Sequence, residues 1–388
     1  MRLLVMCAAL LLLATASASA SGCNLAAPDA ASAGANCARA WMDQNLHLND
    51  IVTVGTHNSY KEAIPDKIMA LIRLGARKSA QALDYSHIPL TDQLNDGARA
   101  IEIDVAYDPA GGLYAHPAGA AMTGLTIPAQ FADTMAKPGF KVLHVQDIDY
   151  RSVCATLIAC LRELKTWSAA HPDHIPILVT MNAKDDEIPF PGSVTPLKFN
   201  TAAFDALDAE ILSVFARDQI VTPDSVQGHF PTLREAVLEH GWPTLGATRG
   251  KFLFALDEDG DKIKAYQGGR KSLEGRVMFV NAPEDSPAAA YLTLNEALTD
   301  TAHITHDVKL GYLVRTRADA DTVEARANDT TRRDKALASG AQYVSTDYMQ
   351  PDPRFGPYEA RMPKGFVAAC NPQRHPERCA GLPVEAGR

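Results

Sequence analysis

The sequence has no apolar run long enough to span a bilayer. Its longest candidate, residues 3–14, is well short of the roughly 20 apolar residues that a transmembrane helix needs. This run follows Arg2 and precedes small residues at positions 18–20, which is the pattern of a secretory signal peptide. We therefore expect residues 1–20 to be a cleaved leader and the mature protein to be secreted or periplasmic.

The chain also lacks an excess of basic residues, Cys-x-x-Cys pairs, internal repeats and Gly/Ser linkers. Its formal net charge of -9 argues against a nucleic-acid partner, which would require a basic face. The same charge disfavours strong adhesion to anionic lipid and leaves peripheral membrane contact through a local rim as the expected mode. With 46% hydrophobic and 21% charged residues, the chain has an ordinary globular composition. We expect a monomer.

The cysteines beyond the leader are even in number and fall into three pairs that are close in sequence. In an oxidising compartment an even set of cysteines indicates disulfides. The sequence has no cluster of cysteine and histidine residues, so a zinc site held by cysteines is not expected. Proximity along the chain favours three bonds, Cys23–Cys37, Cys154–Cys160 and Cys370–Cys379.

Short β-type runs alternate with helical stretches along most of the chain, which favours a (β/α)8 TIM-like barrel over residues 51–350. A doubly wound sheet is the alternative fold. Segments 21–50 and 351–388 are expected to flank this domain and to carry disulfides. The predicted strands are residues 51–54, 98–105, 141–145, 175–181, 251–256, 276–280, 311–316 and 342–346. The predicted helices are residues 156–167, 201–216, 232–240, 295–301 and 319–339.

Polar side chains gather where the first two predicted strands end, and ligands bind at the carboxyl ends of strands in both folds. His57 and Asn58 follow the first strand, and Glu102 and Asp104 share one face of the second. Two buried carboxylates on one face repel each other and need a cation. A barrel lysine or Arg99 could supply it, but a divalent ion held by carboxylate and amide oxygens explains the pattern better. Oxygen ligands favour Ca²⁺ first and Mg²⁺ second.

Later strand ends supply further candidates. His144 ends the third predicted strand, and a pair of histidines beside a cation suits acid-base catalysis. Asn182 and Lys184 lie two residues apart at the end of the fourth, where Asn182 could complete the metal shell and Lys184 could offset phosphate charge or pair with Asp104.

The last two predicted strands add polar residues of lower specificity. Arg315, in the seventh, could place a guanidinium over the site and bind an anionic group. Asp347 and Tyr348 end the eighth and are expected to line the pocket.

These motifs resemble those of the phosphatidylinositol-specific phospholipase C superfamily, in particular its secreted calcium-dependent bacterial branch. The resemblance covers residues 53–186, with weaker agreement to about Asp347, and rests on the segments 55–60, 93–104 and 143–144. It implies a barrel related to the TIM barrel, with His57 and His144 as the two catalytic histidines.

The resemblance also implies calcium ligands and a reaction. Asn58, Glu102 and Asp104 match the family's ligands, whereas Asn182 stands where a further acidic ligand is expected and should weaken calcium binding. The implied enzyme cleaves phosphatidylinositol-type phospholipids to diacylglycerol and cyclic or open inositol phosphate. His57 would take the proton of the attacking hydroxyl.

Alternatives exist for one residue and for the function. His116 is a rival to His144, but it lies in a Gly/Pro-rich stretch and leaves 28 residues before position 144 unexplained. A glycerophosphodiester phosphodiesterase would share the barrel, the metal and the paired histidines, but usually has His-Arg-Gly where this chain has His57, Asn58 and Ser59. A non-catalytic barrel that binds a head group is the other reading, prompted by Asn182.

Overall fold

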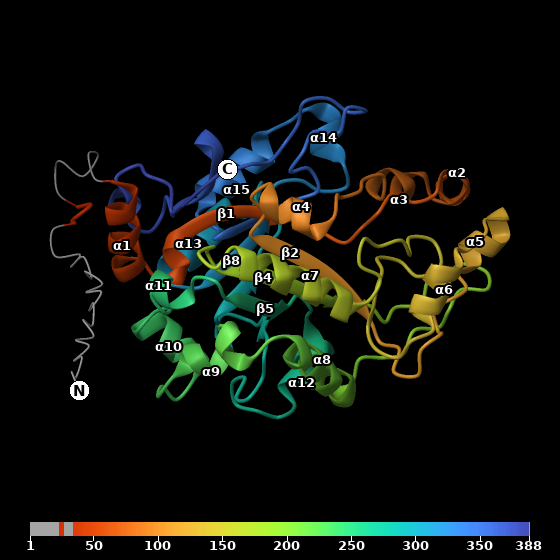
Figure 1. Ribbon diagram of the computed structural model, residues 1–388, viewed down its shortest axis with the longest axis horizontal. Helices are drawn as coiled ribbons and strands as arrows, with labels where there is room; N and C mark the ends of the chain where they lie inside the picture. Colours follow the sequence, from red (N-terminus) through yellow and green to blue (C-terminus); the bar gives the residue numbers. More distant parts are fainter. Residues whose placement is uncertain (1–22, 27–33, 388) are drawn as a thin grey trace, which may run out of the picture.

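The computed structural model describes residues 23–26 and 34–387 as an α/β fold built on two mixed sheets (Figure 1). The predicted leader, residues 1–20, lies outside the described residues. The strands are β1 Ile51–Thr56, β2 Ala100–Ala106, β3 Lys141–Val142, β4 Ile177–Ala183, β5 Phe252–Leu256, β6 Phe279–Val280, β7 Tyr291–Thr293, β8 Leu313–Arg317, β9 Tyr343–Thr346, β10 Phe366–Cys370 and β11 Glu385–Ala386. The α-helices are α1 Ala35–Asn45, α2 Asp66–Gly75, α3 Arg77–Ala82, α4 Leu90–Asn95, α5 Ala118–Thr123, α6 Ala129–Met135, α7 Leu157–Ala170, α8 Thr201–Val214, α9 Pro223–Gln227, α10 Leu233–Glu239, α11 Leu245–Thr248, α12 Gly260–Gln267, α13 Thr301–Leu310, α14 Val323–Ala327 and α15 Thr331–Ser339.

The two sheets contain the parallel strands of a barrel but are not joined into one by continuous hydrogen bonding. One sheet has the order β3-β2-β4-β5-β6, and the other has the order β11-β10-β1-β9-β8-β7. Within them β2, β4, β5 and β6 run parallel, as do β7, β8, β9 and β1. A single parallel bridge between Asn281 and Tyr291 links β6 to β7. The predicted alternation of strands and helices is therefore present, whereas a fully closed ladder is not.

The seam between β1 and β2 is opened by the C-terminal part of the chain. Strand β10 pairs antiparallel with residues 51–53 of β1 and takes the edge that β2 would need. Only the end of β1 reaches β2, where the Arg99 amide donates to the Val54 carbonyl at 3.0 Å. A Cβ on Gly55 would lie 2.1 Å from the Ala100 carbonyl oxygen, so this approach requires glycine.

One predicted barrel strand is wrong, and one parallel strand was not predicted. The third predicted strand, 141–145, is reduced to the two-residue β3, which pairs antiparallel with the end of β2 and lies at the edge of the sheet. The missing parallel strand is β7, which has only three residues and gives too short a signal to detect in the sequence. A short apolar run does not reveal its pairing direction, which explains why β3 resembled a barrel strand.

Most predicted helices are present with small changes at their ends. Thr156 caps α7 by accepting a hydrogen bond from the Ala159 amide, as Thr at this position should. The predicted helix at 295–301 is wrong, because the helical residues there begin at Thr301 and run to Leu310. The predicted helix at 319–339 is divided into α14 and α15 by Asn328, which ends α14 in the left-handed conformation.

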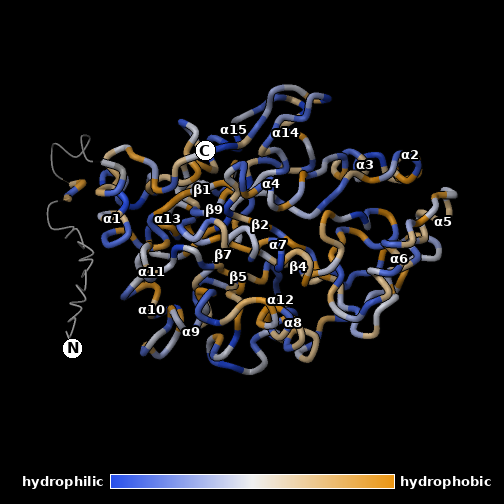
Figure 2. The backbone as a smooth tube through the Cα atoms, in the orientation of Figure 1, coloured by the Kyte–Doolittle hydropathy of each residue, from blue (hydrophilic) through white to orange (hydrophobic). Residues whose placement is uncertain are grey.

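The hydrophobic core lies between the strands and the helices that cover them. Figure 2 shows hydrophobic segments running along the central strands β1, β2, β4 and β5. The main core cluster joins side chains from both sheets with the buried faces of α7 and α8. The three predicted disulfides are all formed, Cys23–Cys37, Cys154–Cys160 and Cys370–Cys379. Across residues 23–26 and 34–387, every helix is too short or too polar to traverse a bilayer.

Candidate active site

The predicted site residues are positioned by the carboxyl ends of several strands. Glu102 and Asp104 lie in β2, Asn182 lies in β4, and Arg315 lies in β8. His57 directly follows β1. Figure 1 shows α2, α3, α5 and α6 beyond this end of the sheets and α1 at the opposite end. The site therefore opens toward the helices that follow β1 and β2.

His57 is held by a carboxylate at one ring nitrogen and faces another at its second. Its Nδ1 lies 2.7 Å from Asp347 Oδ1, and its Nε2 lies 3.6 Å from Glu102 Oε1. Burial, with a further contribution from Arg317, lowers the pKa of His57 to about 3. For Asp347, burial would raise the pKa, but His57 and Arg317 together lower it to about 2. Near neutral pH, His57 is therefore a neutral imidazole beside an ionised carboxylate.

His144 has the same type of support from a different element. Its Nδ1 lies 2.8 Å from Asp149 Oδ2, and Asp149 is in turn 3.3 Å from the buried Lys61 ammonium. His144 does not end a barrel strand, as the sequence suggested, but follows the antiparallel edge strand β3. It lies near enough to Asp104 to contribute to the lowered pKa of that carboxyl.

Glu102 and Asp104 converge on one atom of Asn182. The Asn182 Nδ2 donates to Glu102 Oε1 at 3.0 Å and to Asp104 Oδ1 at 3.1 Å. Both carboxylates are almost completely buried. Burial raises the pKa of Glu102 to about 7, although Arg315 acts in the opposite direction. The positive charge near this carboxylate therefore does not fully compensate for its burial. The three side chains that were expected to share a metal shell thus lie together, but the amide nitrogen of Asn182 and not its oxygen is turned toward the acids.

Two side-chain cations accompany the acid pair. Arg315 is buried and bonds to Glu102 Oε2, and its other terminal nitrogen donates to Asn295 at 2.7 Å. Lys184 lies 3.2 Å from Asp104 Oδ2 and remains about one third exposed. Burial alone would raise the pKa of Asp104, and Lys184 contributes most to its net lowering. Arg99, the other candidate counter-ion, pairs with Glu385 instead.

Asn58, the neighbour of His57, uses its amide nitrogen as a hydrogen-bond donor. It is buried, adopts a left-handed backbone conformation with φ 46°, and donates its Nδ2 to the Tyr85 hydroxyl at 2.8 Å. Asparagine tolerates this conformation better than most residues. Because the amide nitrogen is engaged, Oδ1 is the atom left to act as a ligand.

The donor set fits a hard divalent cation. Carboxylates from Glu102 and Asp104 with amide oxygens from Asn58 and Asn182 are the ligands that Ca²⁺ prefers. The two carboxylate oxygens already converge within 3.0 and 3.1 Å of a single donor atom. Asn182 would have to turn its amide to offer oxygen, and Lys184 competes for Asp104, so the fit indicates modest affinity.

His116 has none of this support. It is exposed on the loop before α5, and in the described part of the chain no hydrogen bond or ion pair involves its side chain. The choice of His144 over His116 stays a prediction.

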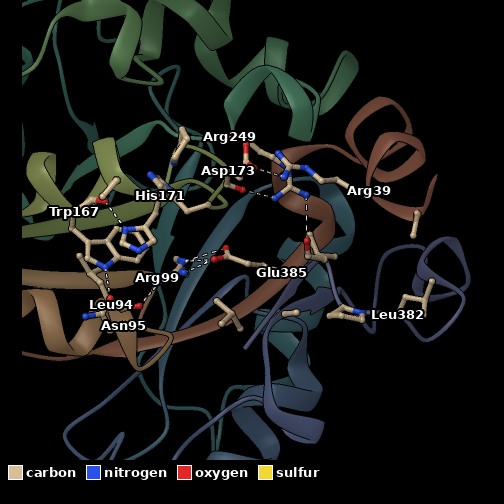
Figure 3. A pocket seen from close by; sticks show the side chains of 18 residues that line it. Arg39, Leu94, Asn95, Arg99, Trp167, His171, Asp173, Arg249, Leu382 and Glu385 are labelled. Carbon is tan, nitrogen blue, oxygen red and sulfur yellow. Dashed lines mark hydrogen bonds and ion pairs between the residues drawn. The ribbon is translucent and has the colours of Figure 1, made fainter. Parts of the chain in front are cut away.

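A large cavity lies at the opposite end of the strands and is not part of this site. It measures about 580 Å³ and lies beside Arg99, His174 and Arg249, which precede β2, β4 and β5 (Figure 3). Arg99 bonds to Glu385, and Arg249 lies 2.5 Å from Asp43. Both arginines are thus paired within the protein, and Arg99 is paired with a residue of the C-terminal segment.

Sequence reasoning missed the residues that orient the two histidines. Asp347 was expected only to line the pocket, and Asp149 was not expected at all. Asp149 follows an edge strand by a tight turn, in which its amide donates to Val145 at 2.8 Å. The only available signal was an acidic residue five positions after His144, which is too common to interpret.

Comparison with known proteins supports the same interpretation. Residues 46–372 match the family model described as "Phosphoinositide phospholipase C, Ca2+-dependent". Among curated protein sequences no relative is detected.

Solved structures with a similar fold include two of a calcium-dependent phosphoinositol-specific phospholipase C from the Gram-negative bacterium Pseudomonas sp. The apo form has a TM-score of 0.52 at 16% identity, with 85% of this chain and 96% of that chain covered. The myoinositol complex has a TM-score of 0.51 at 17% identity, with 84% and 96% covered. At this identity the likeness shows the fold, whereas the family match covers most of the chain. The chain therefore belongs to the calcium-dependent phosphoinositide phospholipase C family.

Proposed function

We propose that the protein cleaves phosphatidylinositol-type phospholipids to diacylglycerol and an inositol phosphate, with His57 and His144 as the acid-base pair. The observation that carries this proposal is the shared geometry of the two histidines. Each binds a buried carboxylate through Nδ1, at 2.7 Å for His57 and 2.8 Å for His144, so Nε2 is the ring nitrogen available for proton transfer. The Nε2 of His57 lies 3.6 Å from Glu102 Oε1. Family membership supports the reaction class.

His57 is suited to accept a proton. A general base must be unprotonated at working pH, and burial keeps the pKa of His57 low at about 3. With Nδ1 donating to Asp347, the lone pair is on Nε2 and can accept the proton of the inositol 2-hydroxyl as its oxygen attacks phosphorus. The new P–O bond forms as the bond to the glycerol oxygen breaks, which gives a cyclic phosphate.

His144 is suited to return a proton to the leaving group. Because Nδ1 is bound to Asp149, Nε2 is the atom left to carry a proton to the departing glycerol oxygen. A water molecule entering in the reverse sense would open the cyclic product, with the two histidines exchanging roles. Asp149 and Asp347 act by orienting the rings.

A calcium ion held by Asn58, Glu102, Asp104 and Asn182 would supply electrostatic stabilisation of charge that develops on the phosphoryl oxygens. Lys184 is exposed enough to approach the phosphate from the other side of Asp104. Arg315, which is buried against Glu102, would act through that carboxylate and not through direct contact.

Exposed apolar residues around the site support peripheral contact with a membrane. Leu74 in α2, Met122 in α5 and Leu197 after β4 are 88%, 52% and 44% exposed. All three follow strands that carry site residues, and the exposed basic residues Arg77 and Lys78 lie close to Leu74 in the sequence. Leu74→Ser with Met122→Ser should weaken sedimentation with phosphatidylinositol vesicles. Unchanged binding would exclude this rim.

The function is tested by the release of water-soluble inositol phosphate from phosphatidylinositol vesicles, with calcium and with a chelator. We expect release of both products with calcium and its loss with chelator. Glycerophosphoinositol serves as a deacylated comparison substrate. Activity on that substrate alone would indicate a glycerophosphodiester phosphodiesterase, and no activity on either at saturating calcium would indicate a binding protein.

A further inference from the structure

A second cluster of metal-binding side chains lies outside the proposed active site. Glu284 lies between β6 and β7, and His303 and Asp307 are four residues apart on α13. That spacing places both side chains on one face of the helix. One ligand atom from each residue lies within 4.8 Å of the others. In the described part of the chain, the cluster shares no hydrogen bond or ion pair with His57, Glu102 or Asp104.

Asp307 is the feature that points to a missing partner. Its side chain is fully buried, and neither carboxylate oxygen accepts a hydrogen bond. A buried carboxylate without donors is costly, and the penalty is typically several kcal/mol per ion. Its nearest charged neighbour is His303, whose Nε2 lies 3.2 Å from Asp307 Oδ2 and 2.6 Å from Glu284 Oε1.

The remaining two ligands are accessible and their backbone positions are fixed. The side chains of His303 and Glu284 are 47% and 41% exposed, so an ion can reach them from solvent. The Glu284 carbonyl accepts hydrogen bonds from Arg234 Nε at 2.6 Å and from the Tyr312 hydroxyl at 2.8 Å. Glu284 is thereby held beside α13 before any ion binds.

One imidazole nitrogen and two carboxylate oxygens form the donor set of a borderline divalent ion such as Zn²⁺, with a fourth position left for water. An all-oxygen set would be expected for Ca²⁺. Tetrahedral Zn²⁺ bonds of about 2.0–2.2 Å place ligand atoms roughly 3.3–3.6 Å apart. Compared with that spacing, the His303–Asp307 separation of 3.2 Å needs almost no change, and the His303–Glu284 separation of 2.6 Å would have to widen.

We propose that Glu284, His303 and Asp307 form a site for a divalent transition-metal ion, with Zn²⁺ as its best-matched occupant. The ion would cross-link the 281–290 segment to α13. This segment spans the junction of β6 and β7, where among the described residues one backbone bridge, between Asn281 and Tyr291, joins the two sheets. A metal there would stabilise a seam that backbone hydrogen bonds leave weak.

The test is equilibrium dialysis of chelator-treated full-length protein against Zn²⁺ with excess Ca²⁺ present, followed by metal analysis. We expect His303→Ala to bind one Zn²⁺ fewer per chain than the wild type, or to bind it at least about 100-fold more weakly, since loss of a group that merely orients a ligand costs about 10–100-fold. His306→Ala, on the neighbouring exposed position, is the matched control and should bind normally.

Asp307→Asn provides a second test of the zinc site, which applies even if His303→Ala folds poorly. Without metal it should unfold at a higher temperature than the wild type, because it removes a buried charge that no hydrogen bond compensates, and Zn²⁺ should no longer raise its midpoint. If His303 instead serves only as a protonated ion-pair partner, Asp307→Asn should be less stable and Zn²⁺ should not affect either protein. That result, or equal zinc binding by wild type and His303→Ala, would overturn the proposal.

Discussion

Replacing Asn182 by aspartate distinguishes an acid pair that is satisfied by side chains from one that is arranged for a cation. The Asn182 amide donates to Glu102 at 3.0 Å and to Asp104 at 3.1 Å. Asn182→Asp removes both hydrogen bonds, each worth about 1.5–3 kcal/mol because its acceptor is charged. It also places a third carboxylate beside two others. Without calcium we therefore expect a loss of at least about 3 kcal/mol.

Calcium should offset the loss of stability caused by Asn182→Asp. The new carboxylate adds a ligand and a negative charge to the donor set, which should tighten Ca²⁺ binding. At saturating calcium the stability difference between the two proteins changes by RT ln of the ratio of their Kd values, so about 100-fold tighter binding by the variant restores about 2.7 kcal/mol. With saturating calcium, the variant should therefore approach or exceed the stability of the wild type.

The assay is thermal unfolding of both proteins in chelator and across a calcium titration. A shift of roughly 2 °C per kcal/mol predicts a fall of about 6 °C or more in chelator. Asn281→Asp makes the same chemical change at the end of β6, where the side chain only accepts a hydrogen bond from the Thr293 amide, and should show no calcium dependence. If Asn182→Asp loses the same stability with and without calcium, the acid pair is not a calcium site.

Three further predictions concern other contacts. Asp149→Asn should lower kcat by about 10²–10⁴ with little change in KM, because the wrong tautomer of His144 becomes favoured, as in related histidine–carboxylate pairs; unchanged kcat on phosphatidylinositol would remove His144 from the mechanism. Burial lowers the pKa of His174 from 6.5 to about 4 in the folded protein. As pH falls below 6.5, His174 is protonated in the unfolded chain before it is protonated in the folded protein. The contribution of neutral His174 to folding stability, which is complete above pH 6.5, is therefore lost as pH falls toward 4. His174→Asn should flatten this part of the pH profile of the unfolding midpoint, and an identical slope would contradict the assignment. Glu385→Ala should lower the free energy of unfolding by about 3 kcal/mol, measured with denaturant, because it removes the partner of the buried Arg99. Glu377 is exposed, so Glu377→Ala should change this free energy little. Equal effects of the two substitutions would show that the Arg99 contact is not stabilising.

Much of the site could be predicted because its residues are local in sequence. Glu102 and Asp104 share a face through the two-residue period of a strand, and His57 and Asn58 directly follow β1. The disulfides could also be predicted, because each joins cysteines that are close along the chain. Such patterns depend on geometry within one element, so they can be recognised without knowledge of the fold.

What the sequence did not reveal depends on long-range pairing. Asp347 reaches His57 from 290 positions away, and Arg315 reaches Glu102 from 213. The pairing of β10 with β1, which prevents a continuous ladder to β2, also joins opposite ends of the chain. Periodicity carries no information on which distant segment will occupy a strand edge or pair with a buried charge.

The central claim is that His57 and His144 act together on a phosphodiester at the carboxyl ends of the strands. Its most direct test is the rate of inositol phosphate release from phosphatidylinositol by His57→Ala, His144→Ala and His116→Ala, each at saturating calcium. We predict losses of about 10³-fold or more for the first two, as expected when a general acid or base is removed. His116→Ala should retain wild-type activity. Full activity in His57→Ala, or a loss confined to His116→Ala, would contradict the account.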